Sequence, residues 1–195
     1  VRFASPLDGQ RLLLTPETRW LTRQIAPCTD PIGERYGVRY QPGTLPDGIS
    51  TTQALLGLGD AFPVTKRPQR QAAPRVTCDA KGKPADATAA VTRWISSTLT
   101  ANAGSIPDPF TPGAADWNST ALGVVGLVAT GTSGRATQTA MQALADNAET
   151  YVNDGTADRP AALGTLLLAT IATGADPEDF GGIDLPARLL ATMQK

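Results

Sequence analysis

The sequence predicts an all-α fold built from repeated helical hairpins, arranged as a solenoid or as a ring. Three observations predict it. Segments with helical hydrophobic periodicity follow one another along most of the 195 residues. Helices with one polar face alternate with helices that are apolar almost all round. Loops rich in proline and glycine separate the segments.

The length and charge of the chain indicate one domain, residues 1–195, without affinity for nucleic acid. We expect residues 1–14 to form an N-terminal arm and residues 63–84 to form an irregular, proline-rich inserted segment. The net charge is −1, so basic charge is not in excess for binding a phosphate backbone. The longest apolar stretch, residues 161–175, contains glycine and threonines and is shorter than a membrane-spanning helix.

The first two predicted helices span residues 15–26 and 47–62. A Thr-Pro pair opens the first, as is typical of the first helical turn. Trp20 lies on its apolar stripe, so we expect Trp20 in the core. Asp47 begins the second helix, where a carboxylate accepts hydrogen bonds from free backbone N–H groups. Between these helices, only residues 36–40 are typical of a strand.

The remaining predicted helices span residues 86–99, 116–131, 135–154, 158–174 and 184–194. An aspartate begins all of them except the segment 135–154, and we expect each aspartate, Asp158 included, to cap its helix. Trp94 lies on an apolar stripe, which predicts that it is buried. Residues 135–154 carry polar side chains along one face, which predicts a helix on the outside of the fold.

A weak internal repeat relates these helices to one another. Aligning Asp47 with Asp116 also matches a Ser-Thr pair and a Gly-Leu pair further along, and "ALG" and "ATG" recur in the 158–174 segment. The unit is an amphipathic outer helix, a loop, and an apolar inner helix with small side chains. We expect the glycines of the inner helices to let neighbouring helices approach closely. These glycines are Gly57, Gly123, Gly126 and Gly164.

Three segments resemble repeats of secreted actinobacterial proteins of the terpene cyclase/protein prenyltransferase-like superfamily. They are "LPDGISTTQALLGL", "DWNSTALGVVGLVATG" and "GADPEDFGGIDLPARLLATMQ". The resemblance covers about residues 15–194, apart from 63–84. It implies an α/α toroid in which the N-termini of the inner helices border a central pocket. Three hairpins and a final helix imply a partial or complete ring, which the arm or a second copy closes.

The two cysteines, Cys28 and Cys78, lie in loop-like surroundings. Buried structural thiols usually lie in apolar helices or strands, so we expect a disulfide and therefore a secreted chain, located outside the cell or at its surface. The alternative is a pair of unrelated thiols in a cytosolic protein.

The chain contains no histidine, which removes Ser-His-Asp and Cys-His catalytic systems and the Asp/Cys/His zinc site of protein prenyltransferases. The acid motif D-x-D-D of type-II terpene cyclases is absent. Carboxylate pairs at 154/158 and 178/179 could act as acid and base. Oxygen ligands between residues 176 and 184 could hold Ca²⁺. Helix capping accounts for these acids more simply.

The candidate ligand-binding residues lie where inner helices begin: Asp47, Asp116, Trp117 and Asn118. Trp117 would supply an apolar face and Asn118 a hydrogen-bonding edge. The sequence therefore predicts a secreted, non-catalytic binding or assembly module. Its partner would be another protein, a second copy or a small ligand, and the resemblance adds a cobalamin-type ligand. We expect no other cofactor and no metal. The alternative is a degenerate cyclase- or lyase-like enzyme that uses carboxylates at the mouth of the pocket.

Overall fold

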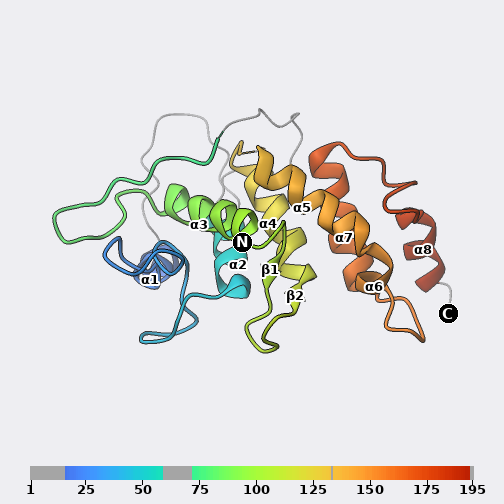
Figure 1. Ribbon diagram of the computed structural model, residues 1–195, viewed down its shortest axis with the longest axis horizontal. Helices are drawn as coiled ribbons and strands as arrows, with labels where there is room; N and C mark the ends of the chain where they lie inside the picture. Colours follow the sequence, from blue (N-terminus) through green and yellow to red (C-terminus); the bar gives the residue numbers. More distant parts are fainter. Residues whose placement is uncertain (1–15, 59–71, 133, 194–195) are drawn as a thin grey trace.

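The computed structural model describes residues 16–58, 72–132 and 134–193. Their helices are α1 (Pro16–Arg23), α2 (Gly48–Leu58), α3 (Ala87–Ala101), α4 (Trp117–Ala129), α5 (Arg135–Asp146), α6 (Ala148–Val152), α7 (Pro160–Thr173) and α8 (Leu185–Thr192). One antiparallel pair of strands, β1 (Ile106–Pro107) and β2 (Ala115–Asp116), leads into α4. The helices lie along the longest axis, from α1 near one end to α8 at the other (Figure 1). The predicted helical fold is confirmed.

The helices pack as an inner row and an outer row. In the inner row, α4 packs between α2 and α7. In the outer row, α3 and α5 pack against each other and against α4, while α8 packs against α7. The apolar helices α2, α4 and α7 therefore share one row, and helices with a polar face share the other. The described residues show these packed hairpins but not a toroid.

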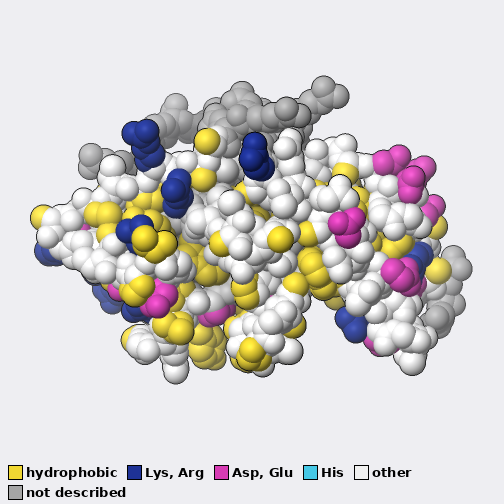
Figure 2. Space-filling view, viewed as in Figure 1, with side chains coloured by type: hydrophobic (Ala, Val, Ile, Leu, Met, Phe, Trp, Pro, Cys, Tyr) yellow, Lys and Arg dark blue, Asp and Glu magenta, His cyan; other side chains and the backbone are white. Residues whose placement is uncertain are grey.

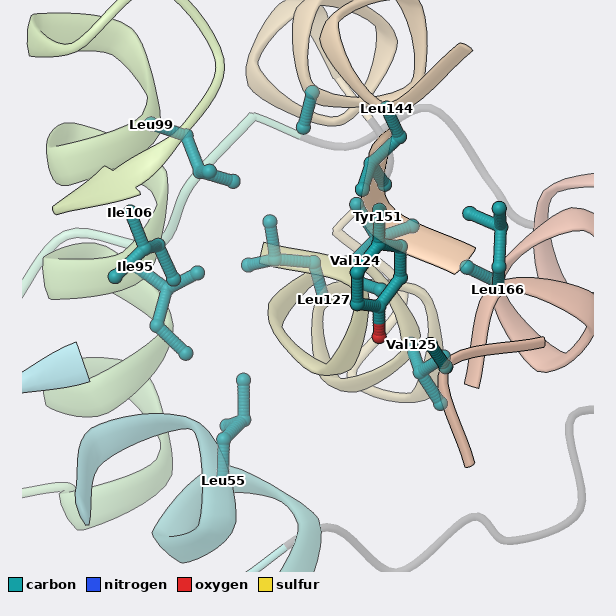
Figure 3. Packing of buried hydrophobic residues seen from close by; sticks show 14 of the residues in the cluster. Leu55, Ile95, Leu99, Ile106, Val124, Val125, Leu127, Leu144, Tyr151 and Leu166 are labelled. Carbon is teal, nitrogen blue, oxygen red and sulfur yellow. The ribbon is translucent and has the colours of Figure 1, made fainter. Parts of the chain in front are cut away.

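The core surrounds α4, of whose thirteen residues nine are buried. Figure 3 shows side chains from both rows converging on this helix. Fully or almost fully buried side chains that it labels are Leu55, Ile95, Leu99, Ile106, Val124, Leu127, Leu144 and Leu166. Each such side chain contributes about 1.5–3 kcal/mol when it leaves water, so this cluster is the main stabilising element of the fold.

The internal repeat is visible in the hydrogen bonds at the starts of α2 and α4. Asp47 caps α2: its carboxylate accepts from the Ser50 amide at 2.7 Å and from the Ser50 hydroxyl at 2.8 Å. Asp116 caps α4 in the same way, accepting from the Ser119 amide at 2.9 Å and from the Ser119 hydroxyl. A carboxylate at this position satisfies backbone donors that the helix leaves unpaired.

The Ser-Thr pair of each repeat also anchors the preceding loop. The Val38 amide donates to the Thr51 hydroxyl at 2.9 Å, and the Ile106 amide donates to the Thr120 hydroxyl at 2.9 Å. All four of these residues are buried. A threonine inside α2 and a threonine inside α4 thus each fix the loop that precedes the helix, which explains why the pair recurs in these two units.

The third unit departs from this pattern, and the predicted cap at Asp158 is wrong. The N-cap of α7 is Arg159, whose side chain makes no capping hydrogen bond. Asp158 instead accepts from Asn153 at 2.8 Å and forms an ion pair with Arg188 of α8. Arg188 also pairs with Glu149, so the start of α7 is tied to α6 and α8 through side chains.

Several other predictions need correction. Trp20 is 56% exposed and does not belong to the core, because α1 ends at Arg23 and lies at one end of the molecule (Figure 1). Residues 36–40 form only isolated bridges rather than a strand. The predicted helix 135–154 breaks at Asn147, between α5 and α6. The strands β1 and β2 were not predicted.

Two of the four inner-helix glycines permit close packing as predicted, and two do not. A Cβ on Gly126 would lie 2.8 Å from a Leu55 methyl, and one on Gly123 would lie 3.2 Å from an Ile95 methyl. A Cβ on Gly57 or on Gly164 would meet nothing within 4 Å. Close approach therefore explains the glycines of α4 but not those of α2 and α7.

The predicted disulfide is confirmed: Cys28 and Cys78 are bonded, with 6.3 Å between their Cα atoms and 50 residues between them in sequence. The described part of the inserted segment, residues 72–84, is irregular as expected, and residues 1–14 lie outside the described residues. Among the described helices, none combines the length and the apolar character needed to cross a membrane.

Candidate functional site

A groove with a cavity volume of about 760 Å³ lies beside α3. Its walls come from the loop 32–36, the start of α2, the segment 75–76, the outer side of α3 and the loop 107–109. We call it the arginine groove, after Arg35, Arg75 and Arg93, which line it. Its volume falls within the range of small-molecule sites.

Trp94 of α3 shapes one wall of the groove. Its side chain is buried, as predicted, and its indole N–H donates to the Gly33 carbonyl at 3.0 Å. A Cβ on Gly37 would lie 2.5 Å from the Trp94 Nε1 and 2.6 Å from the Cβ of Pro46. Only glycine therefore lets this loop lie flat against Trp94, and the loop that carries Arg35 is held in place.

The three arginines of the groove are not neutralised by carboxylates within the described chain. The ion pairs among the described residues join Arg39 to Asp30, and Arg188 to Glu149 and Asp158. The Arg35 guanidinium lies 5.6 Å from the centre of the Tyr36 ring, a cation–π contact that leaves its N–H groups available. Arg75 and Arg93 are exposed. Guanidinium groups in this state can bind a carboxylate or a phosphate.

Two acids also line the groove, and each accepts hydrogen bonds from residues close to it in the chain. Asp47 is the cap of α2, and Asp108 accepts from the amides of Phe110 at 2.7 Å and Thr111 at 3.1 Å. These contacts hold the carboxylates in their own loops. The groove therefore presents three cations against two engaged carboxylates, a balance that favours an anion.

The disulfide supports the wall that carries Arg75. Cys78 lies three residues after Arg75, and its bond to Cys28 joins this segment to the loop that continues into residues 32–36. The Cys28 amide donates to the Gly82 carbonyl at 2.8 Å. The turn is closed by Asp79, whose pKa is lowered by hydrogen bonds from backbone amides, that of Lys83 first. The walls of the groove are thus covalently joined.

The four residues predicted to bind a ligand do not share this groove. Asp47 lines it, whereas Asp116, Trp117 and Asn118 do not. Asp116 caps α4, and Trp117 is partly buried against the core. Asn118 is exposed and accepts a hydrogen bond from the Tyr151 hydroxyl at 3.2 Å.

Tyr151 is the unexpected neighbour of the predicted site. Its pKa is raised to about 12, mainly by burial and to a smaller extent by the nearby charge of Asp116, while a hydrogen bond with Thr165 opposes the shift. The phenol is therefore neutral at physiological pH and acts as a hydrogen-bond donor that joins α6 to the start of α4.

Two of the carboxylates considered for catalysis, Asp154 and Asp158, are engaged in local structure. A hydrogen bond from the Thr156 hydroxyl, followed by bonds from the Ala157 and Thr156 amides, lowers the pKa of Asp154 to about 2. Asp158 is paired with Arg188. Among the described residues, no group of three or more His, Cys, Asp or Glu side chains is placed to hold a metal ion.

Sequence reasoning missed the arginines because they are widely separated along the chain. The one available signal was the Arg93-Trp94 pair, which places a cation beside a buried indole on α3. Arg35 and Arg75 come into the groove only through the loop geometry and the disulfide.

The comparisons with known proteins give no relative for this chain. No family model matches it, and neither the curated proteins nor the solved structures include a significant match. Functional inference therefore depends on the residues themselves.

Proposed function

We propose that this protein is a secreted, non-catalytic binding module whose arginine groove holds an anionic partner. The observation that carries the proposal is the set of three groove arginines, Arg35, Arg75 and Arg93, none of which is in an ion pair within the described chain. Guanidinium groups that lie beside an apolar wall and have no carboxylate partner in the described chain favour the binding of an anion.

The walls define the rest of the ligand. Tyr36, Val76 and Trp94 supply apolar surface, and Pro46, Pro107 and Pro109 add rigid apolar edges. A carboxylate or phosphate attached to an apolar body therefore satisfies both parts of the groove. A cobalamin-type ligand belongs to this proposal only through the superfamily resemblance.

The wider proposal is that the chain is an arc of an α/α toroid and acts outside the cell. The alternation of inner and outer helices and the shared Asp-Ser-Thr arrangement at the starts of α2 and α4 support the first part. The disulfide between Cys28 and Cys78 supports the second, because such bonds persist in oxidising compartments.

The test uses an apolar anion, 8-anilinonaphthalene-1-sulfonate, and its uncharged analogue N-phenyl-1-naphthylamine, both followed by fluorescence titration. The groove variant replaces Arg35, Arg75 and Arg93 by glutamine. The control variant replaces Arg19, Arg23 and Arg135, three exposed arginines that do not line the groove, so the net charge of the two variants is equal.

We expect the groove variant to bind the sulfonate at least about ten-fold more weakly than the control variant, since each charged hydrogen bond contributes about 1.5–3 kcal/mol. Binding of the uncharged analogue should be the same in both. Equal losses of sulfonate affinity in the two variants, or equal affinity for both dyes in the parent protein, would contradict the proposal.

A further inference from the structure

The inner row of helices ends in an exposed apolar strip on α7. Matching the N-caps of α4 and α7, Asp116 and Arg159, sets the two helices in register. Positions that face away from the preceding inner helix then correspond in pairs: Asn118 with Ala161, Ala121 with Gly164, Val125 with Leu168, and Val128 with Ile171. We call Ala161, Gly164, Leu168 and Ile171 the α7 edge.

The same face is covered in α4 and open in α7. Ala121 is fully buried, and Val125 and Val128 are each 3% exposed, because α7 packs beside α4. In the α7 edge, Leu168 is 47% exposed and Ile171 is 58% exposed. The repeat thus shows what this face accommodates, which is an apolar helix with small side chains running beside it.

We propose that the helix that covers the α7 edge is α7 of a second copy of this chain, packed antiparallel about a two-fold axis. In the inner row α4 has a neighbour on each side, whereas α2 and α7 each have one. Of these two end helices, only α7 carries exposed large hydrophobic side chains among the described residues. An interface between identical faces closes at two copies. This inference is independent of the arginine groove, which lies beside α3.

The order of residues along the α7 edge makes it complementary to itself. The small residues Ala161 and Gly164 come first, and the large residues Leu168 and Ile171 follow. Antiparallel packing about the middle of the strip therefore places Leu168 of one copy over Gly164 of the other, and Ile171 over Ala161. A Cβ at Gly164 would meet nothing within 4 Å, so the space for the opposing leucine exists.

The charges at the two ends of α7 favour the same orientation. The helix itself, Pro160–Thr173, contains no charged residue. Arg159, which is exposed, precedes it, and the exposed acid Asp176 follows it. In an antiparallel pair, each Arg159 lies near the other copy's helix C-terminus, where the helix dipole and Asp176 attract a cation.

The acidic surface around α8 does not prevent this pairing. Residues 134–193 contain eight acidic residues and three arginines. Acidic side chains gather over the α8 end on the face shown in Figure 2. Charges further apart than about 8 Å are largely screened at physiological salt, so the contacts at the helix ends outweigh the repulsion.

The experiment is sedimentation equilibrium of the full chain from about 1 µM to about 500 µM, a range that resolves weak self-association. We expect a monomer–dimer equilibrium. Leu168→Glu, which buries a charge in the interface, should weaken association at least about ten-fold. Gly164→Leu should also weaken it because it fills the space for the opposing leucine. The control is Leu190→Glu on α8, whose leucine is 59% exposed and lies outside the α7 edge.

Circular dichroism of each variant verifies that the helices are retained, which is expected because the substituted side chains are at least partly exposed. A monomer at every concentration would overturn the proposal. So would oligomers larger than two, or a loss of association that is as large in Leu190→Glu as in Leu168→Glu.

Discussion

The helices α4 and α7 are alike in composition and differ in their surroundings. Both are uncharged helices of small apolar residues that contain glycine. In α4, Gly123 and Gly126 lie against side chains of neighbouring helices. In α7, Gly164 faces open space, and Leu168 and Ile171 are exposed. Composition therefore identifies an inner helix but does not show how many of its sides are covered.

This difference assigns different roles to the same residue type. A glycine inside a helix costs about 0.5–1 kcal/mol relative to alanine. Gly126 offsets that cost by letting Leu55, which is 1% exposed, lie directly against the α4 backbone. Gly164 has no such contact within the described chain. The destabilisation that this glycine causes is therefore offset only if another helix packs against it.

The largest expected effect comes from placing the same side chain at both glycines. Gly126→Leu should lower the free energy of unfolding by about 3 kcal/mol, because its Cβ alone would lie 2.8 Å from a Leu55 methyl in a filled core. Gly164→Leu should raise it by about 0.5–1 kcal/mol through helix propensity. Urea unfolding of the dilute monomer measures both.

Unfolding is compared at a protein concentration low enough to exclude self-association, because a dimer would add stability by mass action. Similar losses in the two variants would show that α7 is as tightly enclosed as α4 and would end the distinction between them.

The features that sequence could predict are those set by local chemistry. An aspartate at the start of a helical segment was enough to predict the caps at Asp47 and Asp116, because the capping hydrogen bonds reach only three residues along the chain. The apolar character of α2, α4 and α7 likewise placed them in the inner row. The loop setting of Cys28 and Cys78 was enough to predict their bond.

The features that sequence could not predict depend on partners distant in the chain. Asp158 has the position of a cap, yet Arg188, thirty residues away, forms an ion pair with it. Trp20 was expected to share a buried stripe with Leu21 and Ile25, but only those two pack against the core, and Trp20 is 56% exposed. Periodicity shows which side chains share a face and not what faces them.

The candidate site follows the same rule. Asp47 was predicted and lines the groove, since its place depends on the helix it caps. Arg35, Arg75 and Arg93 meet only because a disulfide and a tryptophan hold three segments together. Asn118 has its nearest described partner in Tyr151, on another helix, which composition could not reveal.

The second prediction concerns Tyr151, which is 6% exposed and lies between α4 and α7 in Figure 3. Its pKa is about 12 in the folded chain and near 10 when unfolded. The unfolded chain therefore loses its proton first as pH rises. The stability from this group is complete below pH 10 and is lost between pH 10 and 12, by about 2–3 kcal/mol in total.

Urea unfolding at several values from about pH 8 to pH 12 tests this shift. Tyr151→Phe removes the titrating group and keeps the ring, so the variant should lose less stability over that range than the parent chain. Tyr36 and Tyr40 are the same in both proteins, so their contributions cancel in the comparison. Parallel curves for the two proteins would refute the shift and with it the tight enclosure of the phenol.

The smallest expected effects come from the caps of the two helices. Asp116→Ala should lower the free energy of unfolding by about 1 kcal/mol, because the Ser119 amide loses its acceptor.

Arg159→Ser should raise the free energy of unfolding by about 0.5–1 kcal/mol, since the Arg159 side chain makes no capping bond and a serine hydroxyl can. Arg159→Ala is the matched control: it removes the arginine without adding an acceptor, so any gain specific to serine measures the new cap. If Arg159→Ser is no more stable than Arg159→Ala, the contacts with α6 and α8 already stabilise the N-terminus of α7. The N-termini of α4 and α7 would then differ less in stability than their capping hydrogen bonds indicate.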